Sequence, residues 1–253
     1  MKTSPHPITT NTIEFSSDTL SIPAYVACPV DSGPWPIVIV LQEVFGVNEH
    51  IQAVTNRIAQ EGYVGIAPHI YHRQVPGFAV GYSDADLELG RKYKVGTQAH
   101  ELLSDIQGAI AYGQAHYNTN GSSVGCMGFC FGGHVAYLAA TLPGMTATAA
   151  FYGAGIVSST PGGSEPTLSR TPEIKGTLYG FFGLDDPLIP SSDVDAIEAA
   201  LQQSSVKHRI FRYPQTGHGF FCDQRASYSA SAAEDAWKHV KVLFHNALRN
   251  SAA

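Results

Sequence analysis

The chain has 253 residues, of which 44% are hydrophobic and 14% are charged, and its formal net charge is −6. Soluble domains usually carry roughly 25% charged residues, so this composition predicts a chain with a large apolar interior. An aromatic content of 10% argues against disorder. No apolar run approaches the roughly 20 residues of a membrane helix, and no basic stripe favours nucleic acid. We therefore expect neither a membrane nor a nucleic acid as partner.

Four cysteines are spread along the chain, at Cys28, Cys126, Cys130 and Cys222. Their spacing matches neither a zinc site nor a disulfide framework, and His69 and His72 lack a convincing set of further ligands. Residues 1–7 contain one lysine and no apolar run, so they do not resemble a signal peptide. We therefore expect a cytoplasmic protein with free thiols and without a metal or a cofactor.

Short apolar runs alternate with helical patterns along the whole chain. The expected strands are 12–16, 20–27, 37–41, 63–67, 124–127, 147–152, 177–182 and 208–213. The expected helices are one that carries Ile51, Val54 and Ile58 and ends near Gly62, followed by 100–116, 132–140, 193–203 and about 232–248. Residues 153–174 contain a Ser-Ser-Thr-Pro-Gly-Gly run and are interpreted as an irregular surface excursion.

This alternation predicts an α/β fold with a mostly parallel central sheet and helices on both faces. Neither an internal repeat nor a linker divides the chain, so we expect residues 1–253 to form a single domain. In such sheets, binding and catalysis collect at the loops beyond the carboxyl ends of the strands. The segments that follow each strand are therefore where functional residues are expected.

A nucleophile candidate follows the strand at 124–127. Residues 128–132 read Gly-Phe-Cys-Phe-Gly between a strand and a helix, which is the setting of a nucleophile elbow. Cys130 would stand at a helix N-terminus, where the thiolate is favoured. A lone G-x-C-x-G favours a buried structural cysteine, and the strand-turn-helix context makes the two interpretations equally good. Residues 121–125 match the serine pattern G-x-S-x-G, but they precede a strand, so Ser123 is interpreted as part of a turn.

Carboxylates and a histidine follow two later strands. Asp185 and Asp186 come after 177–182, and His218 comes after 208–213. Asp-Asp-Pro often marks only a turn, and a Gly-His-Gly loop can be plain surface. Together, however, the three groups appear in the chain order of α/β-hydrolases, nucleophile, acid and histidine. Their joint presence on one rim of the sheet predicts catalysis.

The loop after the strand at 37–41 begins Gln42-Glu43-Val44. In α/β-hydrolases this loop supplies one oxyanion-hole N–H, and the residue after the nucleophile supplies the other. Those donors would be the backbones of Val44 and Phe131. Glu43 is unusual in such a loop, and it is either a solvated acid or a partner of the thiol.

With these motifs the chain resembles the dienelactone hydrolase family. The resemblance rests on residues 42–48, 128–133, 186–190 and 217–220. It implies the α/β-hydrolase fold and a Cys130-His218-Asp186 triad, with Asp186 preferred to Asp185. It also implies that Glu43 interacts with the cysteine and helps to set its charge. The expected activity is cofactor-free hydrolysis of a small lactone or carboxylic ester through a thioester, as in carboxymethylenebutenolidase, by a monomer or weak homo-oligomer.

The chain departs from the family in its cationic residues. The two arginines that hold a substrate carboxylate in the family would fall at Cys222 and Glu88. Arg91 and Arg225 are nearby candidates to replace them, and a neutral lactone or ester is an equally open substrate. Tyr71 and Phe220 are candidate aromatic residues of the substrate pocket, although packing is the commoner role for such residues.

A non-hydrolytic protein on the same scaffold is the alternative. It would be a binding protein, or a thiol redox sensor that pairs Cys126 with Cys130. The position of Cys126 inside a strand, with its side chain expected in the core, argues against that disulfide.

Overall fold

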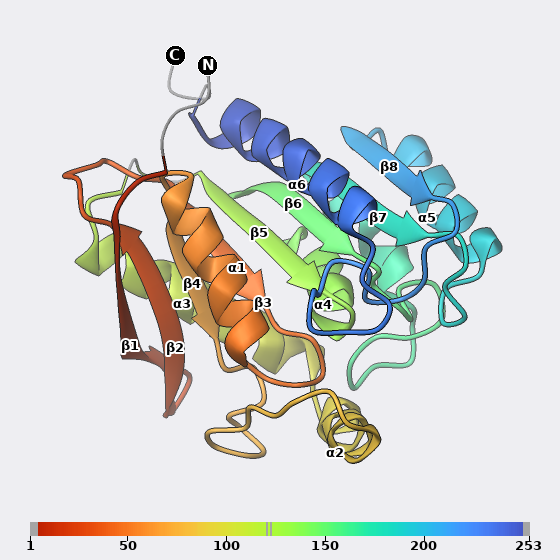
Figure 1. Cartoon of the computed structure of the whole chain (residues 1–253), viewed down its shortest axis with the longest axis horizontal. Coiled ribbons are helices and arrows are strands. Elements are labelled where there is room, and N and C mark those ends of the chain that lie inside the picture. Colours follow the sequence, from red (N-terminus) through yellow and green to blue (C-terminus); the bar gives the residue numbers. More distant parts are fainter. Residues whose placement is uncertain (1–4, 120, 122, 250–253) are drawn as a thin grey trace.

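The computed structural model describes residues 5–119, 121 and 123–249, and within them one mixed sheet has eight strands in the order β1-β2-β4-β3-β5-β6-β7-β8 (Figure 1). The strands are β1 (Ile8–Ser17), β2 (Leu20–Pro29), β3 (Ile37–Leu41), β4 (Val64–Pro68), β5 (Val124–Phe129), β6 (Met145–Phe151), β7 (Thr177–Gly183) and β8 (His208–Tyr213). Antiparallel pairing joins β1 to β2 and β2 to β4, and the remaining neighbours are parallel. The predicted α/β fold with a mostly parallel sheet is confirmed.

Helices cover both faces of this sheet. The helices are α1 (Glu49–Gln60), α2 (Asp84–Val95), α3 (Ala99–His116), α4 (Phe131–Ala139), α5 (Ser191–Gln203) and α6 (Ala230–Phe244), with a 3₁₀-helix at Thr167–Glu173 and a π-helical turn at His245–Arg249. Figure 1 shows α1 and α6 in front of the sheet and α3 and α4 behind it. Within the described residues, no helix combines the length and apolar character needed to cross a bilayer.

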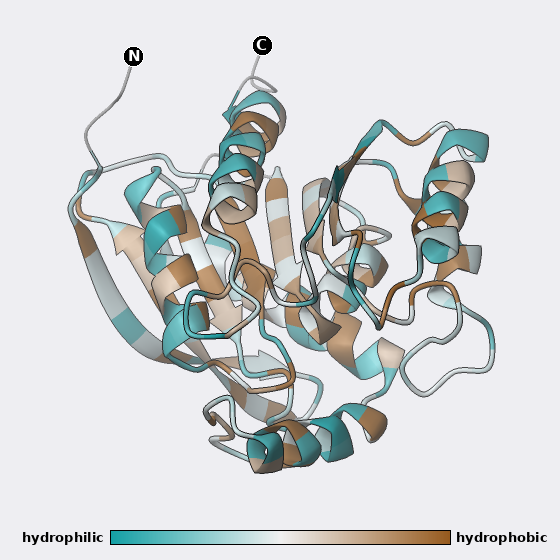
Figure 2. Cartoon of the chain, turned by 45° about the vertical axis from the view of Figure 1, so that its right-hand side comes forward, coloured by the Kyte–Doolittle hydropathy of each residue, from teal (hydrophilic) through white to brown (hydrophobic). Residues whose placement is uncertain are grey.

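The central strands carry the core. Every residue of β3 and β5 is buried, as expected for parallel strands that are covered on both faces. Figure 2 shows this contrast, because the central strands are mainly brown whereas teal residues lie on the helices. β3 lies between β4 and β5, so the order of strand addition reverses there. The carboxyl ends of β3 and β5 therefore flank a topological switch point, where α/β proteins place their ligands.

Each predicted strand and helix has an observed counterpart whose ends lie within four residues of the prediction, and two differences have a physical explanation. The helix expected to reach about residue 248 leaves α-helical geometry after Phe244 and ends in the π-helical turn. The sequence interpretation missed α2, which begins with a capping box between Ser83 and Asp86. Among its described residues only Gly90 is buried, so α2 has little apolar periodicity to reveal it.

Some expectations fall on residues without a described position. The argument against a signal peptide rests partly on residues 1–4, and the serine pattern includes Ser122. Residues 1–4 and Ser122 lie outside the described residues. Ser123 is described and lies immediately before β5, at the end of the strand opposite to Cys130. The excursion at 153–174 is irregular apart from its 3₁₀-helix and an isolated bridge between Thr160 and Gly163.

A buried ion pair ties the segment after β4 to α3 and to the β1–β2 turn. The Arg73 guanidinium donates to Asp105 through Nε at 3.1 Å and Nη2 at 2.7 Å, and Nη2 also reaches Ser17 Oγ and Asp18 Oδ2. Asp105 is only 1% exposed. The same segment carries Tyr71, which stacks on Phe131. This ion pair therefore helps to hold the segment that packs against the turn at Cys130.

Replacing Asp105 by Ala should lower the free energy of unfolding by about 3 kcal/mol, because it leaves a half-buried guanidinium without its main partner. Urea unfolding followed by circular dichroism measures this loss. Asp18→Ala is the matched control, and it should have a much smaller effect because Asp18 is 52% exposed. Equal losses in the two variants would contradict this assignment.

Candidate functional site at the carboxyl ends of β3, β5, β7 and β8

Cys130 occupies the turn between β5 and α4. Its backbone lies at φ 54° and ψ −116°, a conformation that is costly for a residue with a Cβ. A Cβ at Gly128 would lie 2.0 Å from the carbonyl oxygen of Gly132. A Cβ at Gly132 would lie 2.4 Å from the carbonyl oxygens of Leu41 and Gln42. These close approaches hold the turn and place the Cys130 side chain at the N-terminus of α4.

His218 and Asp186 face each other from the loops after β8 and β7. His218 Nδ1 lies 2.7 Å from Asp186 Oδ2, and Asp186 Oδ1 accepts a hydrogen bond from the Leu188 backbone at 2.8 Å. Both side chains are buried, whereas neighbouring Asp185 is exposed. The structure therefore pairs His218 with the carboxylate that the sequence analysis preferred.

Cys130 lies close enough to His218 to influence its protonation. Burial by itself would lower the pKa of His218, but the charge of Cys130 and the hydrogen bond to Asp186 outweigh burial and raise this pKa to about 10. His218 Nε2 forms no well-aligned hydrogen bond with a described residue. The imidazole is thus oriented by Asp186 through Nδ1 and leaves Nε2 for a proton transfer.

Tyr152 follows β6 directly and packs its ring edge-on against His218, with centroids 5.1 Å apart. Its backbone has a positive φ of 35°, and its buried hydroxyl has no hydrogen-bond partner in the described part of the chain. Burial and the nearby Glu43 carboxylate raise the pKa of Tyr152, which keeps the hydroxyl protonated. The sequence interpretation did not single out this residue, although its position at a strand end was a usable signal.

Glu43 is a buried carboxylate in the loop after β3, with 1% of its surface exposed. Its Oε1 accepts a hydrogen bond from Arg225 Nη1 at 2.9 Å, while Oε2 has no partner among the described residues. Burial acts to lower the pKa of Arg225, but Glu43 and Cys130 raise it above its usual value. Glu43 is therefore a paired and buried acid, and the alternative of a solvated loop acid is wrong.

The two backbone groups expected to form an oxyanion hole are available. Neither the Val44 nor the Phe131 N–H donates a hydrogen bond to any described residue. α2 covers this loop at close range, because a Cβ at Gly90 would lie 2.2 Å from the Val44 carbonyl oxygen. The position of Val44 thus depends on the helix that the sequence did not predict.

The candidate substrate-binding residues lie in different environments. Tyr71 is 1% exposed, stacks on Phe131 and donates to the Gly90 carbonyl oxygen at 3.4 Å. Phe220 is fully buried beside Tyr152, with ring centroids 5.2 Å apart. Both aromatic side chains pack inside the protein. Arg91 is exposed on α2 and forms no ion pair with the described residues, whereas Arg225 contacts Glu43.

The remaining thiols and histidines do not support the redox alternative. Each of the four cysteines is free. Cys126 is completely buried in β5, and burial raises the pKa of its thiol, which disfavours the thiolate that disulfide chemistry requires. In the part of the chain that is described, His69 and His72 belong to no group of three potential metal ligands.

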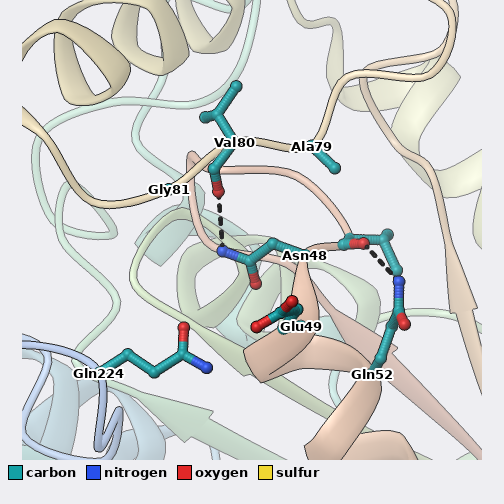
Figure 3. Close-up of a pocket in the computed structure, with 8 residues that line it drawn as sticks. Asn48, Glu49, Gln52, Ala79, Val80, Gly81 and Gln224 are labelled. Carbon is teal, nitrogen blue, oxygen red and sulfur yellow. Dashed lines mark hydrogen bonds between the residues drawn. The ribbon is translucent and has the colours of Figure 1, made fainter.

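A pocket of about 440 Å³ lies on the outer side of the loop after β3 (Figure 3). It is lined from the start of α1 by Asn48, Glu49 and Gln52, and from other segments by residues 79–81 and Gln224. Asn48 Nδ2 donates to the Val80 carbonyl oxygen at 3.1 Å and so closes one wall. Cys130, Asp186 and His218 do not line this pocket, so it does not mark the reacting centre.

The sequence profile of the dienelactone hydrolase family matches residues 22–248. The chain belongs to the dienelactone hydrolase family. The elbow after β5, the acid after β7 and the histidine after β8 lie within the matched region. The protein is accordingly a dienelactone hydrolase-like hydrolase that acts on small substrates.

Relatives of this dienelactone hydrolase family member cover nearly its full length. A protein of Synechocystis sp. named "Putative carboxymethylenebutenolidase" is 53% identical over 96% of this chain and 98% of its own. The "Carboxymethylenebutenolidase" of Pseudomonas putida is 29% identical over 83% of this chain and 85% of its own. A crystal structure of a "Putative Dienelactone Hydrolase" from Klebsiella pneumoniae superposes with a TM-score of 0.85 at 31% identity. The superposition covers 94% of this chain and 99% of the other.

The raised pKa of His218 predicts a pH-dependent contribution to stability. The folded state holds this proton up to a pKa of about 10, whereas an unfolded histidine titrates near 6.5. The stabilisation is therefore complete below about pH 6.5 and is lost as the pH rises towards about 10. The difference in unfolding free energy between wild type and His218→Gln should shrink over that window. Urea titrations across it measure the difference, and a difference independent of pH would contradict the raised pKa.

Proposed function

We propose that the protein hydrolyses small lactones or carboxylic esters through a thioester formed on Cys130. The observation that carries the proposal is the strained Cys130 turn at the N-terminus of α4, beside an imidazole oriented by Asp186. A protonated imidazole next to a thiol stabilises the thiolate, which is the nucleophilic form of cysteine. The raised pKa of His218 is consistent with such a pair. A working thiolate also requires a reducing compartment, for which we propose the cytoplasm.

In the first half-reaction the Cys130 sulfur attacks the acyl carbon and forms a C–S bond. The carbonyl oxygen becomes an oxyanion, which the Val44 and Phe131 N–H groups stabilise. The intermediate then collapses by breaking the bond to the alkoxy oxygen. His218 Nε2 donates its proton to that leaving oxygen, while Asp186 keeps the imidazole in the required orientation.

In the second half-reaction water hydrolyses the thioester. Neutral His218 takes a proton from the water through Nε2 as its oxygen attacks the acyl carbon. The same oxyanion donors stabilise the second intermediate, which breaks the C–S bond and releases the carboxylic acid. The thiolate–imidazolium pair is regenerated. The two half-reactions together consume one substrate molecule and one water, and they need no cofactor.

We propose that Glu43 acts as a positioning residue that modulates the charge of the Cys130 thiol. Glu43 and Cys130 both influence the pKa of Tyr152 and Arg225, which supports a shared electrostatic environment. Arg225 neutralises Glu43 in the structure. A ligand that draws Arg225 away would leave the negative charge of Glu43 uncompensated and so change the electrostatic environment that Glu43 shares with Cys130.

Replacing Cys130 by Ala should reduce hydrolysis of an activated ester at least about 10³-fold, because the nucleophile is lost. Cys28→Ser is the matched control, since Cys28 is a half-buried thiol in β2, outside the site. Initial rates with the purified variants measure the effect. If Cys130→Ala retains the wild-type rate, the thioester mechanism is wrong.

Arg225 is the cation that we propose contacts an acidic substrate, because its side chain is 20% exposed next to Glu43. Arg225→Gln should then lower kcat/KM for a carboxylate-bearing lactone about tenfold more than for the corresponding methyl ester, which corresponds to one charge-assisted hydrogen bond. Arg91→Gln on exposed α2 is the control. Equal losses on both substrates would limit Arg225 to its contact with Glu43.

A further inference from the structure

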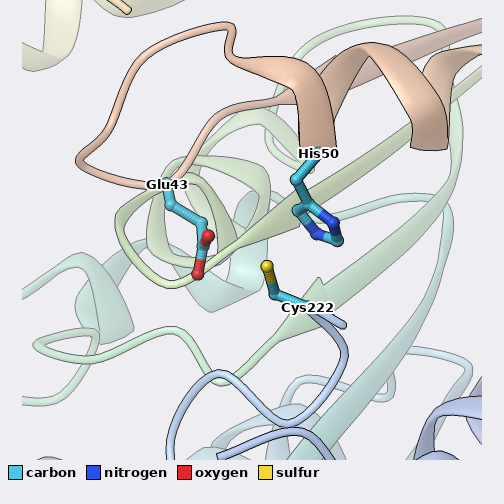
Figure 4. A group of neighbouring side chains, drawn as sticks. All are labelled: Glu43, His50 and Cys222. Atoms are coloured by element: carbon cyan, nitrogen blue, oxygen red, sulfur yellow. The ribbon is translucent and has the colours of Figure 1, made fainter. Parts of the chain in front are cut away.

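Behind the proposed site, three chemically different metal-binding groups meet in the protein interior. One carboxylate oxygen of Glu43, one ring nitrogen of His50 and the Cys222 sulfur all lie within 4.8 Å of one another. Figure 4 shows the three side chains directed towards a common space from the loop after β3, the start of α1 and the segment after His218. Each of the three residues is buried.

Two of these groups have unsatisfied atoms. Glu43 Oε2 and His50 Nε2 are buried and have no hydrogen-bond partner among the described residues. His50 is 4% exposed and is otherwise surrounded by aromatic rings, with Phe129 at 5.8 Å and Phe221 at 6.4 Å between centroids. Buried polar atoms without partners are uncommon and call for a ligand or an ordered water.

From this geometry we propose that Glu43, His50 and Cys222 bind a divalent cation of the zinc class. Thiolate, imidazole and carboxylate are the donors that zinc takes in proteins. In a tetrahedral zinc site such donor atoms are separated by roughly 3.3–3.8 Å, so small side-chain movements bring this cluster to coordination distance. Three protein ligands leave a fourth position for water.

The surrounding charges are compatible with this ligand. Deprotonated Cys222 and Glu43 would place two negative charges next to the cation, and Arg225 bonds Glu43 through Oε1, which leaves Oε2 for the metal. Cys222 donates its proton to Tyr82 Oη at 3.2 Å, and coordination would replace that proton. A carboxylate that is hydrogen-bonded through one oxygen is held in orientation for a metal at its other oxygen.

His50 also connects the cluster to the surface. It lines a pocket of about 110 Å³ whose other members include the exposed acids Asp223 and Glu234. Arg57 lines the same pocket, but its guanidinium lies over the Trp237 ring at 4.2 Å. The pocket gives a cation a route of approach that does not pass through the Cys130 turn.

No sequence spacing signals this site, because its ligands come from positions 43, 50 and 222 and zinc motifs are recognised from closely spaced pairs. The cation takes no step in the proposed hydrolysis, but it would share Glu43 with that mechanism, so the test reads metal binding by absorbance and not by activity. A second thiol–imidazole pair, Cys130 with His218, is the competing location for a soft cation, and the test must separate the two.

Cobalt(II) is a suitable probe because its thiolate complexes absorb in the near ultraviolet. The chelator-treated full-length protein should bind one cobalt ion with a thiolate charge-transfer band, and one equivalent of zinc should remove the band. Cys222→Ser should abolish the band, and His50→Gln should weaken cobalt binding at least about tenfold. Cys28→Ser and Cys130→Ser should retain both the band and the stoichiometry.

The inference is overturned if wild type shows no thiolate band at one equivalent of cobalt, or if Cys222→Ser retains it. Loss of the band in Cys130→Ser but not in Cys222→Ser would place the cation at Cys130 and His218 and also reject the proposal. Thermal unfolding of each variant by circular dichroism verifies that it is folded. If Cys222→Ser fails to fold, His50→Gln and Cys130→Ser still separate the two locations, because only the former should weaken cobalt binding.

Discussion

The strained backbone at Cys130 is the constraint on which the candidate site depends. Holding a non-glycine residue at φ 54° costs about 1–3 kcal/mol, and the surrounding packing must offset this cost. The close contacts of Gly128 and Gly132 with neighbouring backbone are part of that packing. A Cβ at Gly133 would lie 2.1 Å from the Phe151 carbonyl oxygen. The elbow is thus clamped between β3, β5 and β6, and its orientation follows from the sheet.

The parallel sheet that holds the Cys130 turn also explains why the other site groups converge. Parallel strands bring their carboxyl ends to one edge, so the loops after β3, β7 and β8 meet the elbow there. The Asp185 backbone N–H donates to the Thr216 carbonyl oxygen at 3.0 Å, which ties the acid loop to the histidine loop. Buried polar groups then become mutually dependent: Asp186 orients His218, and Arg225 neutralises Glu43. Each of these two contacts joins segments that follow different strands.

Much of the fold was predictable because buried strands and amphipathic helices leave regular patterns. β3 was predicted at its observed bounds, since burial on both faces selects an unbroken apolar run. α2 was not predicted, because it is exposed and approaches the protein through a glycine. Cys130, Asp186 and His218 could be proposed from sequence because each lies within five residues of the end of a strand. The Glu43–Arg225 contact spans 182 residues and follows no local spacing, so only the folded chain reveals it.

The central claim is that Cys130 is the nucleophile of the hydrolase, and stoichiometric alkylation tests it most directly. Wild-type protein is treated with iodoacetamide for increasing times. Residual ester hydrolysis is then compared with the fraction of the Cys130 peptide that carries the carboxamidomethyl group, measured by mass spectrometry. The account predicts that activity falls in proportion to Cys130 modification and reaches zero when the residue is fully alkylated. Full activity in protein whose Cys130 is completely alkylated would contradict it.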